Sequence, residues 1–94
     1  MQKDVRISFS GTTISVDQKK VQPKAKDDTV GWSGPQQYTL ILHLPSGGTQ
    51  TINSSPQGSQ FLASAGPWDS KQNIKYDVHA SGFDPLDPDI EVLP

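Results

Sequence analysis

The chain contains no cysteine. Without thiols it can form no disulfide, no thiolate metal site and no iron–sulfur cluster, and it has no cysteine nucleophile for covalent catalysis. This absence removes much of redox and metal chemistry from consideration. It leaves the cellular compartment open, because cytosolic proteins and many exported proteins lack cysteine alike.

The chain also lacks an apolar run long enough to cross a membrane. Its first residues, MQKDVRISFS, have no apolar centre of the kind found in a signal peptide. We therefore expect no membrane attachment. If the natural protein is exported, we expect that its signal has been removed and Met1 added.

Positive charge is scarce and scattered. The formal net charge is −2, the isoelectric point is about 5.4, and lysines cluster locally at Lys19–Lys20 and Lys24–Lys26 alone. No stripe of basic residues is present that could follow a nucleic-acid backbone. We expect no binding to nucleic acid, and we interpret these lysines as a solvated turn and a blunted sheet edge.

Hydrophobic residues make up only 32% of the 94 residues, which is few for a folded domain. A disordered chain usually combines low hydrophobicity with strong self-repulsion, but here the net charge is small and the apolar residues alternate with polar ones. We therefore predict a single β-sandwich domain over residues 1–94, with a thin core.

Alternation with a period of two residues predicts short β-strands, and no segment has the periodicity of a helix. Glycine and proline, eight of each, separate the strands with turns. Val21 begins a short strand that Pro23 restricts to a sheet edge. We expect loops at Asn53–Ser59 and from Gly66 to Asn73. The other expected strands are Val5–Phe9, Ile14–Val16, Thr29–Trp32, Tyr38–Leu44, Thr49–Ile52, Ile74–Ala80 and Ile90–Val92.

The segment from Ile14 to Trp32, ISVDQKKVQPKAKDDTVGW, is followed by a turn, a long core strand and a later strand with the sequence KYDV. This arrangement resembles the cupredoxin-like β-sandwich, in which a strand with a Val-x-Trp pattern follows an acidic turn, as Thr29–Trp32 follows Asp27–Asp28 here. It looks most like small uncharacterised bacterial proteins of that shape that end in a segment of the Leu-Asp-Pro-Asp-Ile-Glu-Val type.

The predicted fold class is thus all-β, a single-domain Greek-key β-sandwich of about seven to nine short strands, cupredoxin-like or immunoglobulin-like. The immunoglobulin-like alternative stays open because Tyr76, two residues before Val78, would suit a tyrosine corner. At the end of the chain we expect a core-facing strand, because Asp84-Pro85 and Asp87-Pro88 stiffen the loop before it and fix its entry angle.

Blue-copper members of the cupredoxin family bind the metal with two histidines, a cysteine thiolate and usually an axial methionine. The resemblance places the first histidine shortly after the tryptophan-bearing strand, where residues 33–37 contain no histidine. It places the remaining ligands between the last two strands, where residues 81–89 contain no cysteine, histidine or methionine. The resemblance therefore implies the fold without the copper site, and we expect no cofactor.

His43 and His79 are the only histidines, and each lies on the less apolar face of a predicted strand. If those strands are neighbours, the imidazoles could approach each other on the outer surface, with Asp77 nearby as a third metal ligand. The alternative, which we favour, is a pair of ordinary surface histidines on half-buried strands.

Asp84, Asp87 and Asp89 could present carboxylates to calcium from one loop, because hard cations take oxygen ligands from closely spaced acids. Their spacing does not match the regular acidic loop of an EF-hand. The prolines that follow two of them offer a simpler explanation, since they stiffen the loop. We favour this structural role and expect no metal ligand in the chain.

Trp68 lies between Gly66-Pro67 and Asp69 in a polar loop, where an exposed ring could stack against a sugar. Burial in the core, or as a plug of a loop, is the more common role of an indole. We favour that role for both Trp32 and Trp68. The triplet Asn53-Ser54-Ser55 fits a glycosylation sequon, which has meaning only in a eukaryotic secretory pathway.

No serine lies in a nucleophile-elbow setting, and no arrangement of Asp, Ser and His is typical of a hydrolase, so we expect no enzyme. We expect a non-catalytic, cofactor-free β-sandwich that serves as an interaction or structural module, with a protein partner bound through loops or an exposed edge strand. The alternatives are a carbohydrate- or small-ligand-binding module that uses an exposed Trp68, and a divergent metal-binding cupredoxin relative that uses His43 and His79. Oligomeric state is left open.

Overall fold

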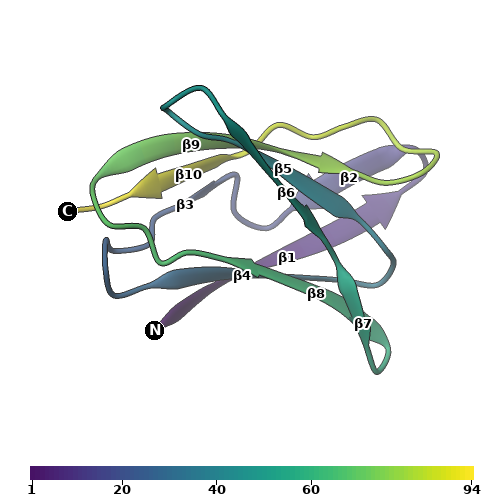
Figure 1. Cartoon of the computed structure of the whole chain (residues 1–94). Coiled ribbons are helices and arrows are strands. Elements are labelled where there is room, and N and C mark those ends of the chain that lie inside the picture. Colours follow the sequence, from purple (N-terminus) through teal and green to yellow (C-terminus); the bar gives the residue numbers. More distant parts are fainter.

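The computed structural model describes residues 1–94, which form two β-sheets packed face to face (Figure 1). It contains no helix, and hence none that could cross a membrane. The predicted all-β sandwich is confirmed, with ten strands. The strands are β1 Gln2–Ser10, β2 Thr13–Val16, β3 Lys20–Val21, β4 Thr29–Gly34, β5 Thr39–His43, β6 Thr49–Asn53, β7 Ser55–Gln57, β8 Gln60–Ala65, β9 Gln72–His79 and β10 Asp89–Val92.

The first sheet has the strand order β2-β1-β4-β8-β7, and the second has the order β3-β10-β9-β5-β6. Most neighbouring strands are antiparallel, but β1 pairs with β4, and β10 with β3, in parallel. Parallel neighbours cannot be joined by a tight turn, so the chain crosses between the sheets. Four strands lie at sheet edges: β2 and β7 in the first sheet, β3 and β6 in the second.

One apolar core fills the space between the sheets. Inward-facing side chains alternate along the strands as a period of two requires. On β5, Leu40 and Leu42 have no exposed surface, and the same is true of Ile74 and Val78 on β9. Fifteen buried hydrophobic residues join in this single cluster, so the thin core suggested by the composition is nevertheless continuous.

A hydrogen bond between two aromatic side chains joins the sheets at the centre of the core. Nε1–H of Trp32, on β4, donates to the hydroxyl oxygen of Tyr76, on β9, over 3.1 Å, and the rings meet edge to face. Burial raises the pKa of Tyr76 to about 12. The hydroxyl bonds to a side chain of the opposite sheet and not to nearby backbone, so Tyr76 does not form the tyrosine corner of the immunoglobulin-like alternative.

The final strand lies inside its sheet. β10 pairs with β9 on one side and with the short strand β3 on the other. Ile90 and Val92 have no exposed surface, which confirms the predicted core-facing strand. Backbone bonds hold its entry point, because the N–H of Asp89 donates to the carbonyl oxygen of Lys19 over 2.7 Å.

The loop predicted at Asn53–Ser59 is partly wrong. Ser55–Gln57 form β7, which pairs with β8 to make a hairpin. The turn of this hairpin contains Gly58, whose φ of 65° lies in the left-handed region that glycine adopts without strain. All three residues of β7 are exposed and show no apolar alternation, so the strand forms because the hairpin turn places it beside β8.

Candidate functional site

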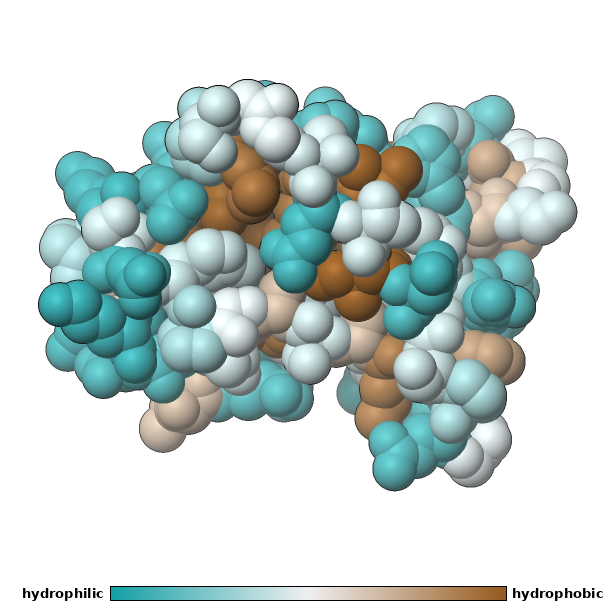
Figure 2. Space-filling model, in the orientation of Figure 1, coloured by the Kyte–Doolittle hydropathy of each residue, from teal (hydrophilic) through white to brown (hydrophobic).

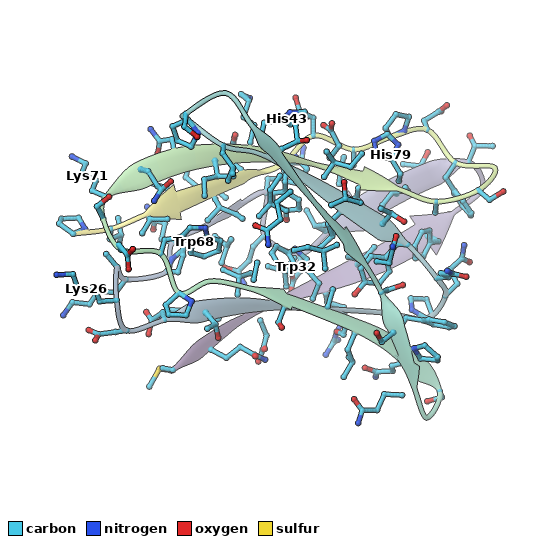
Figure 3. All side chains as sticks on the ribbon, in the orientation of Figure 1. Lys26, Trp32, His43, Trp68, Lys71 and His79 are labelled. Carbon is cyan, nitrogen blue, oxygen red and sulfur yellow. The ribbon has the colours of Figure 1, made fainter.

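Both histidines lie close to Asp77 on the outer face of the second sheet. Strands β5 and β9 are neighbours, and Asp77 is paired with Ile41. Oδ2 of Asp77 lies 2.8 Å from Nε2 of His43 and 4.0 Å from Nε2 of His79. In Figure 3 both imidazoles lie on the outside of this sheet, away from the core. The structure thus brings together the three residues that the sequence singled out.

This group of side chains does not form a metal centre. Along the register of β5 and β9, His79 is paired with Thr39, on one side of the Ile41–Asp77 pair, whereas His43 lies on the other side. The imidazoles therefore approach the carboxylate from opposite ends. No group of three or more His, Cys, Asp or Glu side chains is arranged to hold a metal ion. The imidazole side chains are 48% and 44% exposed, as surface histidines are.

The three aspartates near the end of the chain do not share a site. The backbone N–H of Asp84 donates to the carbonyl oxygen of Thr12, beside β2. Asp87 and Asp89 lie near Lys75 instead, whose Nζ is 4.0 Å and 3.4 Å from their carboxylate oxygens. The ammonium group of Lys75 thus lies beside the two carboxylates that would bind calcium. The geometry gives the calcium hypothesis no support.

Trp68 closes one end of the sandwich. It is half-buried against the core, and its ring covers Gly66, where a Cβ atom would come within 2.8 Å of the ring. The carbonyl oxygen of Trp68 accepts a hydrogen bond from the N–H of Lys26, which ties the loop to the segment before β4. Figure 3 shows the indole between the two layers. A groove of about 620 Å³, lined in part by Gln50 and Lys71, lies beside it.

Strand β6 offers a different kind of site. It pairs with β5 alone, and its other side has no neighbouring strand. Two backbone hydrogen bonds just beyond its ends show which residues are paired by hydrogen bonds. The N–H of Leu44 donates to the carbonyl oxygen of Gly48, and the N–H of Ser54 donates to that of Tyr38. In an antiparallel ladder, hydrogen-bonded and non-hydrogen-bonded positions alternate. The direction of every backbone group between these two anchors follows from that alternation.

Gln50 and Ile52 fall at the hydrogen-bonded positions, so their N–H and C=O groups point toward β5. Thr49, Thr51 and Asn53 fall at the positions between, so their backbone groups point away from the sheet. No loop backbone bonds to these outward groups. β6 therefore presents a row of unpaired donors and acceptors, which is a template for another strand.

The other three edges are each blunted. β3 carries Lys20, as the lysine pattern predicted, and Pro23 follows it closely. β7 contains Pro56, which has no N–H to donate. β2 has only four residues, and Asp84 bridges its outer side at Thr13. β6, like β2, contains neither charge nor proline, but no bridge covers its outer side. Of the four edges it is therefore the one with neither kind of protection.

The side of the sandwich at β6 is hollowed at both ends of the strand. The groove beside Trp68 includes Gln50, and a second groove of about 480 Å³ includes Ile52, Trp32 and Leu62. Figure 2 shows hydrophobic side chains reaching this face as separate patches among hydrophilic ones. Side chains of an added strand would therefore find space on the inner side of β6.

Among solved structures, the chain is similar to the oxidized P96G mutant of amicyanin, with a TM-score of 0.60. The two sequences are 12% identical, and the match covers 94% of this chain and 80% of that one. No protein-family model and no curated protein matches the sequence. The similarity at this level concerns the fold, and the chain has a cupredoxin-like β-sandwich, as the sequence suggested.

The residues present do not fit the copper site of that fold. A blue-copper centre requires a cysteine thiolate, and the chain has none. The two histidines lie on the outer face of the second sheet, on the side opposite the core, with Asp77 between them. His43, His79 and Asp77 therefore form a polar group on the protein surface, not a copper site.

The open edge of β6 is the feature that sequence reasoning missed. The strand itself was predicted at Thr49–Ile52, but its position at an edge depends on the strand order. The sequence of Thr49–Asn53 gives no signal of this position, because a strand without charge or proline can equally lie inside a sheet.

Proposed function

We propose that the protein is a non-catalytic, cofactor-free interaction module that binds a protein partner by accepting an extended strand at β6. The observation that carries this proposal is the row of outward backbone groups of Thr49, Thr51 and Asn53. Addition of a strand to a sheet edge is a common mode of peptide recognition, in which backbone hydrogen bonds provide the affinity. A bacterial origin, to which the C-terminal segment points, is part of the same proposal.

The surroundings of β6 support this mode of binding. Specificity in strand addition comes from pockets that receive alternate side chains. Here the inner side of β6 borders two grooves, one at Gln50 and one at Ile52. Both grooves are lined mostly by polar residues, so a partner strand with small or polar residues at its inward positions would fit beside them.

A carbohydrate-binding module that uses Trp68 has less support. Stacking of a sugar requires an exposed face of the indole, whereas Trp68 is half-buried against the core and covers Gly66. A metal-binding function for His43 and His79 is also less supported, because their side chains approach Asp77 from opposite ends. An open edge together with a half-buried Trp68 favours the strand-binding proposal over both alternatives.

Selection of random linear peptides against the immobilised protein tests the proposal. We expect the selected peptides to shift the backbone amide NMR signals of Thr49, Thr51 and Asn53 more than those of other residues. Thr51→Pro should weaken their binding at least about tenfold, because the substitution removes an outward N–H that the added strand would use.

The substitution is specific because the N–H of Thr51 does not take part in the ladder with β5. Thr51→Val is the matched control, since it keeps both the N–H and the branched side chain, and it should bind as the wild type does. Peptides that bind Thr51→Pro and the wild type equally well would contradict the proposal.

A further inference from the structure

The outward groups of β6 are arranged symmetrically about Thr51. Thr49 and Asn53 lie two residues to either side of it, and all three direct N–H and C=O groups away from β5. If two copies of β6 lie antiparallel with Thr51 facing Thr51, then Thr49 of each copy faces Asn53 of the other. Every outward residue then falls at a hydrogen-bonded position, which gives about six bonds between the copies.

The side chains permit the same pairing. Strand Thr49–Asn53 contains no charged residue, so no like charges oppose each other across the pair. On the inner side, Gln50 of one copy lies opposite Ile52 of the other. The net charge of −2 is also small, so two copies repel each other weakly.

We infer that the strand accepted at β6 is β6 of a second copy of this chain, so that the second sheets of two copies join into one continuous sheet around a two-fold axis at Thr51. This inference rests on the proposed function, because it names the partner of the same edge. In this closed two-fold arrangement the outward backbone groups of both β6 strands are paired with each other. No free edge then remains at β6 for a further copy.

The dimer is weak and reversible. A strand of five residues contributes a contact smaller than the roughly 1,200 Å² at which stable interfaces begin. The copies therefore exchange between monomer and dimer across the micromolar to millimolar range, and the association is a function of protein concentration.

Sedimentation velocity over a concentration series tests the inference. Between about 20 µM and about 1 mM, the wild-type mass should rise from 10.2 kDa toward twice that value. Thr51→Pro should stay at the monomer mass, and Thr51→Val should follow the wild type. Circular dichroism of each variant checks that the sandwich is intact, and Thr51→Lys, which adds a charge facing its own copy, provides a second test with an unchanged backbone.

A wild type that stays monomeric throughout would overturn the inference, and so would self-association that Thr51→Pro and Thr51→Lys leave unchanged. The two experiments distinguish the second copy from the strand-binding function. If the wild type is monomeric but selected peptides bind at β6, the second copy is wrong and the strand-binding function stands. If neither a second copy nor any peptide binds at β6, both are wrong.

Discussion

At the residue scale, the contact between Trp32 and Tyr76 shows how a thin core is made specific. Each indole or phenol buries a large apolar surface but also brings a polar group that needs a partner. Here each supplies the partner of the other, across the two sheets, at 3.1 Å. No buried side-chain nitrogen or oxygen is left without a hydrogen bond. The pair therefore fixes how the sheets face one another.

Tyr76→Phe should destabilise the protein. The change removes the hydroxyl group and leaves the Nε1–H of Trp32 buried without an acceptor, which costs roughly 1–3 kcal/mol. Urea unfolding followed by tryptophan fluorescence measures the loss. A double-mutant cycle with Trp32→Phe should show coupling between the two sites. Additive effects of the two substitutions would contradict the hydrogen bond as the cause.

The same residue predicts a dependence of stability on alkaline pH. Burial raises the pKa of Tyr76 to about 12 from an ordinary value of 10.0, and it also raises the pKa of Tyr38. As pH rises, the phenols therefore ionise in the unfolded chain before they ionise in the folded protein. Their contribution to folding stability is complete below pH 10.0 and is lost as pH rises toward 12. Tyr76→Phe should lose less stability over this range than the wild type. An equally steep loss in both proteins would contradict the assignment to Tyr76.

At the scale of elements, β10 matters more than its place in the chain suggests. Chain ends commonly fray unless they are tied down. β10 lies between β3 and β9, and its inward residues Ile90 and Val92 are fully buried. Its removal would therefore open the middle of a sheet, not an edge.

Deletion of Asp89–Pro94 should abolish folding. Each of the two buried aliphatic side chains contributes roughly 1.5–3 kcal/mol, and the strand also forms hydrogen bonds on both sides. The free energy of unfolding of a whole domain is about 5–15 kcal/mol, so the truncated chain would keep little of it. The NMR spectrum of the truncated chain should lose its dispersion. A dispersed spectrum with a thermal midpoint within a few degrees of the full chain would show that β10 is dispensable.

Local patterns predicted most elements with a strongly apolar buried face. They missed β8, whose inward residues Phe61, Ala63 and Ala65 form a weak apolar pattern. Ile74–Ala80 alternates clearly and was predicted, because the core imposes the period. β7 was missed because its three exposed residues have no apolar pattern and pair with β8 through the hairpin turn. The parallel pairing of β1 with β4 depends on the crossing of the chain between sheets, which no local pattern specifies.

The same limit applies to the candidate site. The sequence could place His43 and His79 on outer faces of strands, but their approach to Asp77 depends on β5 and β9 being neighbours. The absence of a copper site could be predicted, because it requires only that a ligand type be missing. The exposed edge of β6 could not, because it is a property of the strand order.

At the scale of the whole molecule, the fold is separate from the metal chemistry associated with it. The sandwich is held by one continuous core of fifteen residues and by its backbone ladders. None of these interactions uses a thiolate. A cupredoxin-like fold can therefore serve as a scaffold that presents a sheet edge.

The protein should fold without metal. No group of side chains is arranged so that folding would depend on a bound metal ion. Addition of EDTA to the protein as purified should therefore leave the thermal midpoint unchanged. Differential scanning calorimetry with and without the chelator provides the comparison. A drop of several degrees would contradict this prediction and would support a calcium site at Asp87 and Asp89.

Amide hydrogen exchange along β6, measured residue by residue by NMR in dilute protein, shows whether the outer side of this strand is open. The open edge predicts an alternating pattern: Gln50 and Ile52, bonded to β5, exchange slowly, whereas Thr49, Thr51 and Asn53 exchange faster by a factor on the order of 100. At high concentration, or with a bound peptide, the three fast amides should become protected. Uniform protection of all five amides in the dilute protein would mean that the edge is already covered, which would contradict strand addition at β6.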